Sequence, residues 1–102
     1  MLTLLLLRHA KSSWDDLSLD DFDRPLAKRG TKAAAAIGQH LVKHALIPDL
    51  VLCSTAVRTR ATLTLVMNEF TEATPTVVYD EALYLADAET LLEKIRAIKG
   101  YP

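Results

Sequence analysis

The 102-residue chain has a single cysteine, Cys53, and no excess of either charge. One cysteine excludes an intramolecular disulfide and agrees with a reducing compartment. The 12 lysines and arginines against 13 aspartates and glutamates leave a net charge of −1. Neither a basic field nor a run of Lys and Arg therefore points to nucleic acid as a partner.

Long hydrophobic runs are absent too. The N-terminal apolar run, Leu2 to Leu7, is too short for a membrane span or a signal-peptide core, and no basic segment precedes it. We therefore expect a soluble, cytoplasmic protein with no membrane partner. Half of the residues are apolar and a quarter are charged, which is typical of one globular domain over residues 1–102.

The chain does contain short apolar runs that alternate with amphipathic segments. Residues 2–8 form an apolar run without polar alternation, which predicts a strand covered on both faces. The runs LVLC at 50–53 and TVVY at 76–79 predict two further strands. Residues 9–25 are polar and predict an irregular segment.

Three helices are predicted from the periodicity. The first, from about 30 to 45, has apolar residues at three- and four-residue steps: Ala33, Ala34, Ile37, Leu41, Val42 and Ala45. The second follows Ser54 as N-cap and continues through Phe70, before Thr74-Pro75 breaks it. The third follows Asp87 as N-cap, carries Leu91, Leu92, Ile95 and Ile98, and stops at Gly100 and Pro102.

The β-α-β-α-β-α order predicts a parallel sheet with helices packed on its faces. Ligands of such sheets bind beyond the carboxyl ends of the strands. Arg8 and His9 follow the first predicted strand, and residues 54–58 follow the second. We therefore expect both groups at the same edge of the sheet.

Cations stand at helix starts, where the helix dipole disfavours them. Arg58 and Arg60 lie in the opening turns of the second helix, and the first helix opens with Lys28, Arg29 and Lys32. A bound phosphate would turn this cost into a gain, because helix N-termini and guanidiniums both favour it. The alternative, side chains that extend into solvent, is favoured for all of them except Arg58, where both interpretations stay open.

A histidine beside such cations can act as the nucleophile on phosphorus. It forms an N-phosphoryl intermediate that water then hydrolyses. Arg8 and Arg58 would supply two guanidiniums to hold the phosphate oxygens around His9. A structural role is the alternative for His9, since it is the commoner role of a lone histidine.

Four segments, in order, resemble the histidine phosphatase superfamily of phosphoglycerate-mutase-like enzymes. They are LLLLRHAKSSW at 4–14, DFDRPLAKRG at 21–30, DLVLCSTAVRTRAT at 49–62 and YDEALYLADAETLL at 79–92. They are most similar to the SixA-like phosphohistidine phosphatases. The resemblance implies an α/β three-layer sandwich with a mainly parallel sheet. It implies a phosphatase, without cofactor or metal, whose substrate is a phosphorylated protein histidine or a small phosphomonoester.

The resemblance also implies roles for individual residues. His9 matches the phosphate-accepting nucleophile, and Arg8 and Arg58 match the phosphate-binding arginines. Arg24, in the DRPL stretch, matches a position that reaches the substrate.

Four further positions bear on this comparison. Thr55 and Thr59 stand where the family usually has Pro and Ala, and neither is expected to abolish binding. Either Glu81 or Asp87 is the candidate for the general acid. For each of them the alternative role is a surface charge or a helix cap.

One family feature has no counterpart, namely a second histidine on a later strand. His40 and His44 lie within the first predicted helix, and with no third ligand evident they predict no metal site. In the family fold the strand bearing the second histidine lies between the first two strands seen here. We therefore expect only the N-terminal part of the domain, with open sheet edges. Two alternatives to an active phosphatase follow: a catalytically incomplete phosphate-binding remnant, and an interaction protein that borrows a strand and forms a homo-oligomer.

Overall fold

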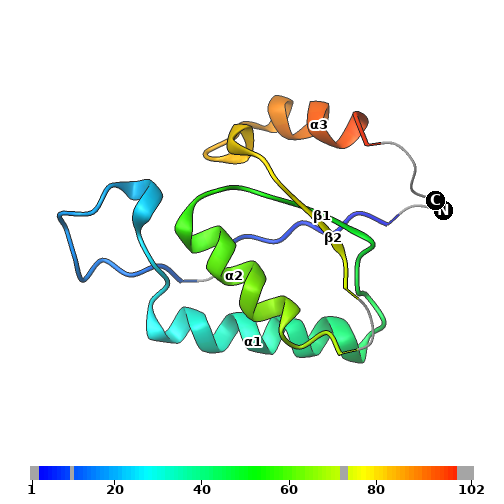
Figure 1. The fold of residues 1–102 in the computed structure, drawn as a ribbon, viewed down its shortest axis with the longest axis horizontal. Coiled ribbons are helices and arrows are strands. Elements are labelled where there is room, and N and C mark those ends of the chain that lie inside the picture. Colours follow the sequence, from blue (N-terminus) through cyan, green and yellow to red (C-terminus); the bar gives the residue numbers. More distant parts are fainter. Residues whose placement is uncertain (1–2, 10, 72–73, 99–102) are drawn as a thin grey trace.

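The computed structural model describes residues 3–9, 11–71 and 74–98. Its elements, in chain order, are η1 (Asp21–Asp23), α1 (Lys28–Lys43), β1 (Leu50–Cys53), α2 (Val57–Met67), β2 (Thr76–Tyr79), η2 (Glu81–Leu83) and α3 (Ala88–Arg96). β1 and β2 pair in parallel, and α3 lies on the opposite side of them from α1 and α2 (Figure 1). This layered arrangement confirms the predicted α/β fold with a parallel sheet.

Both strands have the bounds that the sequence predicts. Their register places Leu50 opposite Thr76 and Cys53 opposite Tyr79. Successive side chains of a strand face opposite sides, so Cys53 is buried on the α2 side while Leu50 and Leu52 line a groove of about 280 Å³ beneath α3. Cys53 is thus the one buried residue of the two strands.

The α3 layer is tied to the end of β2. Lys94 Nζ lies 2.8 Å from Asp80 Oδ2, and Asp80 in turn accepts a hydrogen bond from the Ala82 amide at 2.9 Å. As predicted, Asp87 caps α3, because its Oδ1 accepts from the Thr90 amide at 2.8 Å. The predicted stop at Gly100 and Pro102 lies outside the described residues.

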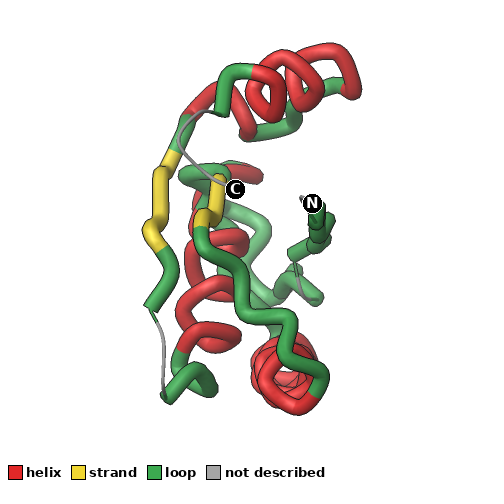
Figure 2. The backbone as a smooth tube through the Cα atoms, turned by 90° about the vertical axis from the view of Figure 1, so that its right-hand side faces the viewer, coloured by secondary structure: helices red, strands yellow, loops and turns green. Residues whose placement is uncertain are grey.

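The strand predicted at 2–8 is not formed over the described residues 3–8. This segment stands apart from the two strands (Figure 2), and Leu4 and Leu6 are 60% and 78% exposed. A strand needs a neighbour whose backbone completes its hydrogen bonds. Within the described ranges β1 pairs with β2 alone, so the apolar run has no ladder to join.

Three helix boundaries also differ from the prediction. α1 begins at Lys28 rather than at about residue 30. Ser54 is not the N-cap of α2: its Oγ accepts from the Ala56 amide at 3.3 Å, closing a turn before the helix, and Ala56 occupies the cap position. α2 ends at Met67, so Phe70 lies beyond it.

α1 packs on α2 through small residues rather than through its largest apolar ones. The buried positions of α1 are Gly30, Ala34 and Gly38, while Ile37 and Val42 are each 40% exposed. A Cβ atom on Gly38 would lie 2.5 Å from the Val66 carbonyl oxygen of α2. Glycine at position 38 lets the two helix backbones approach closely, whereas Gly30 faces the Lys11 backbone.

Gly38→Ala is expected to destabilise the chain by about 1–3 kcal/mol, because the added methyl group would press on Val66 and force the helices apart. Urea unfolding followed by circular dichroism measures this loss. Gln39→Ala, at the next and exposed position of α1, is the matched control and should leave stability unchanged or slightly raised. A Gly38→Ala chain as stable as wild type would contradict the close contact.

Candidate active site

Arg58 lies in the first turn of α2, just beyond the carboxyl end of β1. Its side chain is nearly buried, with the residue 6% exposed. The Thr62 hydroxyl donates to the Arg58 carbonyl at 2.7 Å, and Thr59 Oγ1 lies within 2.9 Å of the Ser54 carbonyl oxygen. A solvated side chain is therefore the wrong interpretation for Arg58.

The other cations at the helix starts behave differently. The residues concerned, all exposed, are Lys28, Arg29, Lys32 and Arg60. The solvated interpretation thus holds for this group. All five cations lie near a helix N-terminus, where the helix dipole disfavours positive charge. Only Arg58 among them is buried.

Arg24 is the second nearly buried arginine, at 7% exposure. Its Nε donates to the Ser13 carbonyl at 3.3 Å, its Nη2 donates to Ser12 Oγ, and its guanidinium lies 3.3 Å from the centre of the Trp14 ring. Arg24 therefore holds residues 12–14, which follow the Arg8-His9 pair in the chain, by hydrogen bonds and a cation–π contact. Direct contact between Arg24 and a substrate stays a prediction.

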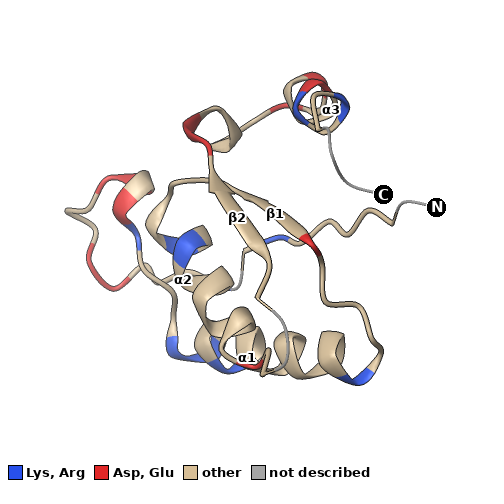
Figure 3. Ribbon diagram, turned by 45° about the vertical axis from the view of Figure 1, so that its right-hand side comes forward, with Lys and Arg blue, Asp and Glu red and all other residues tan. Residues whose placement is uncertain are grey.

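Asp21 brings the two arginines together. Its Oδ1 lies 3.1 Å from Arg24 Nη1, and its Oδ2 lies 3.0 Å from Arg58 Nη2. Arg58 Nη1 also donates to the Asp21 backbone carbonyl at 2.6 Å. Figure 3 shows the acidic η1 region facing the basic first turn of α2.

Tyr84 completes this cluster from the segment after η2. Its hydroxyl donates to Asp21 Oδ2 at 2.5 Å, and its ring packs edge-to-face on Phe22 with centroids 5.2 Å apart. The Tyr84 hydrogen bond, followed by Arg58, lowers the pKa of Asp21 below its ordinary value. The same hydrogen bond raises the pKa of Tyr84, because deprotonation would place two anions side by side.

Sequence reasoning named the arginines but missed Asp21 and Tyr84. Asp21 is one of five aspartates between residues 15 and 23, and composition alone does not separate it from the others. Its spacing of three residues before Arg24 is a weak signal for an ion pair across one helical turn. Tyr84 is 63 residues from Asp21, and no local pattern reports such a contact.

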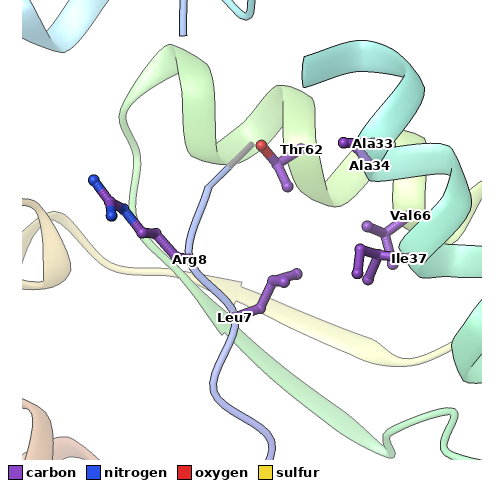
Figure 4. Close-up of a pocket in the computed structure, with 7 residues that line it drawn as sticks. All are labelled: Leu7, Arg8, Ala33, Ala34, Ile37, Thr62 and Val66. Atoms are coloured by element: carbon purple, nitrogen blue, oxygen red, sulfur yellow. The ribbon is translucent and has the colours of Figure 1, made fainter. Parts of the chain in front are cut away.

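Arg8 lies beside the same helix as Arg58. Leu7 and Arg8 border a cavity of about 220 Å³ that Ala34, Thr62 and Val66 also line. Leu7 points towards the apolar side chains, whereas the Arg8 guanidinium points away from them and is exposed (Figure 4). This apolar cavity is not suited to phosphate, but its lining places residues 7–8 across from Thr62 of α2, one turn beyond Arg58.

His9 is half-buried and lies between the cavity-lining residues 7–8 and a backbone attachment at Lys11. On its N-terminal side, Leu7 and Arg8 line the cavity whose other walls include Thr62 and Val66 of α2. On its C-terminal side, the Lys11 carbonyl accepts from the Ala27 amide at 2.7 Å. A Cβ atom on Gly30 would collide with the Lys11 backbone, so glycine is required for this approach.

The carboxylates considered as general acids have other roles in the structure. Asp87 caps α3, which confirms the helix-cap alternative for this residue. Glu81 is exposed within η2. Cys53 is a buried thiol whose pKa is raised by burial, which does not suit a thiolate nucleophile.

Neither a metal-ligating cluster nor a membrane-spanning helix occurs in the ranges that the structure describes. His40 and His44 lie with ring centroids 4.3 Å apart, yet no group of three or more metal-ligating side chains occurs among the described residues. None of the helices in the described part of the chain has the length and apolar character needed to cross a bilayer.

The model of the histidine phosphatase superfamily (branch 1) matches residues 4–84, which include both arginines of the cluster, Asp21 and His9. The chain belongs to this superfamily. Among solved structures, a candidate phosphohistidine phosphatase SixA from Agrobacterium tumefaciens has a TM-score of 0.82 and 37% identity, covering 89% of this chain and 58% of that one. These matches confirm the superfamily and its SixA-like branch.

Curated relatives agree with this assignment in sequence. An uncharacterized chloroplast protein of Arabidopsis thaliana is 58% identical over 60 residues, covering 59% of this chain and 28% of its own length. An uncharacterized protein of Mycobacterium leprae is 43% identical over 95 residues, covering 90% and 56%. The chain thus spans about half, or less, of the length of these relatives. Its cytoplasmic location stays a prediction.

The lowered pKa of Asp21 predicts a pH-dependent stability. A carboxyl with a depressed pKa stabilises the fold above its unfolded value, ordinarily 3.8, and this contribution is lost as the pH falls through the folded value. The free energy of unfolding of wild type should therefore exceed that of Asp21→Asn at about pH 6, and the difference should shrink towards about pH 3.

Urea unfolding at the two pH values measures this difference. Asp23→Asn removes the same charge from η1 and serves as the control, because Asp23 has no ion pair among those seen in the described residues. A difference between wild type and Asp21→Asn that stays constant with pH would contradict the role of the ionised carboxylate.

Proposed function

We propose that this chain carries the phosphate-binding and nucleophilic residues of a histidine phosphatase. In the first step, a ring nitrogen of His9 forms a bond to phosphorus while the bond from phosphorus to the leaving group breaks, and the leaving group takes up a proton. In the second step, water attacks phosphorus, the His9–phosphorus bond breaks and inorganic phosphate leaves.

The observation that carries this proposal is the pair of nearly buried arginines, Arg24 and Arg58, that contact one carboxylate. Arg24 and Arg58 share one carboxylate, so the cluster keeps an excess of positive charge. Buried cations without full compensation favour an anionic ligand, and the open amides at the start of α2 favour the same. The exposed Arg8 guanidinium would add a further charge near the developing negative oxygens.

The proposed substrate is a phosphorylated protein histidine or a small phosphomonoester. Membership of the SixA-like branch supports this choice. The leaving group of a phosphohistidine is an imidazole, which departs readily once it is protonated. Such a substrate is therefore compatible with the lack of an evident general acid. Neither a cofactor nor a metal is part of the proposal.

His9→Ala is expected to lower hydrolysis of p-nitrophenyl phosphate by at least about a hundredfold, because the phosphoryl acceptor is removed. The assay is run on the 102-residue chain with excess EDTA, which should not inhibit. His40→Ala, a substitution on the exposed face of α1, is the control and should retain activity.

Two results would decide against this mechanism. Hydrolysis that survives in His9→Ala would exclude this histidine as the nucleophile. Phosphate binding without turnover, lost in Arg58→Ala, would instead identify a catalytically incomplete phosphate-binding remnant.

A second candidate function is favoured by the exposed N-terminal leucines. Leu4 and Leu6 are 60% and 78% exposed on a segment without strand pairing. An unpaired apolar segment next to a two-stranded sheet can accept a strand from another chain. In this alternative the protein is an interaction module that forms a homo-oligomer, and the family strand with the second histidine would occupy the same place.

Sedimentation equilibrium at several concentrations tests this candidate. The expected result is a mass that rises with concentration in wild type and stays at the monomer value in Leu6→Lys. Leu17→Lys is the matched control, since Leu17 is 83% exposed in the loop before η1 and should not affect association. A wild-type chain that is monomeric at every concentration would contradict strand exchange between copies.

A further inference from the structure

Asp21 contacts Arg58 in a way that fixes the plane of its guanidinium. The two terminal nitrogens of Arg58 donate to two different groups of the same residue, the backbone carbonyl at 2.6 Å and Oδ2 at 3.0 Å. Two such bonds to one partner leave a guanidinium no freedom to rotate about its long axis. The orientation of Arg58 is therefore set by Asp21.

We propose that Asp21 is a positioning residue that orients Arg58 for oxyanion binding. This inference rests on the proposed function. A guanidinium carries five N–H donors in one plane. The two bonds to Asp21 use two of these donors. Preorganised donors bind a developing charge better than mobile ones, because the cost of ordering them is already met by the fold.

Asp21 is itself held from two further directions. Arg24 contacts Oδ1 at 3.1 Å, and Tyr84 donates to Oδ2 at 2.5 Å. The groups that face the carboxylate thus come from the chain before α1, from α2 and from the segment after η2. A carboxylate held at both oxygens keeps one rotamer, and so transmits a fixed geometry to Arg58.

The opposite interpretation makes Asp21 an internal anion that phosphate has to displace. This interpretation is disfavoured because one of the two hydrogen bonds that Arg58 donates is accepted by the Asp21 backbone carbonyl. A rotation of the Asp21 side chain cannot move that carbonyl away from Arg58. Displacement would require the η1 backbone to move as well. The two interpretations predict opposite effects of removing the charge.

Binding of inorganic phosphate to the 102-residue chain, measured by calorimetry, distinguishes them. Asp21→Asn is expected to weaken phosphate binding about tenfold, and Tyr84→Phe to weaken it by a smaller factor. Asp23→Asn, which removes the same charge from η1, should leave affinity unchanged or slightly raised. Affinity that is unchanged or increased in Asp21→Asn would overturn the proposal. If Asp21→Asn does not fold, Tyr84→Phe decides by the same criterion.

A second measurement separates this proposal from the proposed function. Nitrogen–proton NMR spectra of the Arg58 guanidinium should show separate, slowly exchanging Nη signals in wild type and averaged signals in Asp21→Asn. Averaged signals in wild type would overturn the positioning role, whatever the chain binds. A chain with restrained Arg58 signals that fails to bind phosphate would overturn the proposed function and leave the Asp21–Arg58 restraint confirmed.

Discussion

The Asp21 carboxylate, shared by two nearly buried guanidiniums, is the interaction on which the candidate site depends. Burying a guanidinium without an anion nearby is costly, and removing one partner of such a pair leaves an uncompensated charge. Asp21 meets this requirement for Arg24 and Arg58 together, while its own side chain stays 45% exposed. It thereby joins η1, α2 and the segment after η2, which are distant in sequence, into one edge of the molecule.

The stretch from Arg24 to Gly30 has a physical explanation in this arrangement. Arg24 donates hydrogen bonds to the Ser12 hydroxyl and the Ser13 carbonyl, and the Pro25 carbonyl accepts a hydrogen bond from the Ser13 amide at 2.7 Å. Because Gly30 has no Cβ atom, the Lys11 backbone can lie against the start of α1. The stretch therefore docks the segment that follows His9, and the candidate nucleophile is placed by backbone contacts of its neighbours rather than by the sheet.

The sheet itself contributes less to the site than a complete layer would. β1 supplies a fixed end from which α2 and Arg58 start, and Cys53 packs this end on the α2 side. Residues 3–8 have the composition of a third strand, but their leucines remain exposed, and no strand of the described residues pairs with them. An apolar run forms a β-strand only when a neighbouring strand completes its backbone hydrogen bonds.

The sequence by itself determined the features that depend on near neighbours. These include the bounds of β1 and β2, the Asp87 cap of α3, the place of Arg58 at a helix start, and membership of the superfamily. Only the tertiary structure decided which aspartate pairs with the arginines, that small residues form the α1–α2 contact, and that residues 3–8 stay unpaired. The physical reason is that periodicity and capping act over a few residues, whereas charge compensation, close packing and strand pairing join groups tens of residues apart.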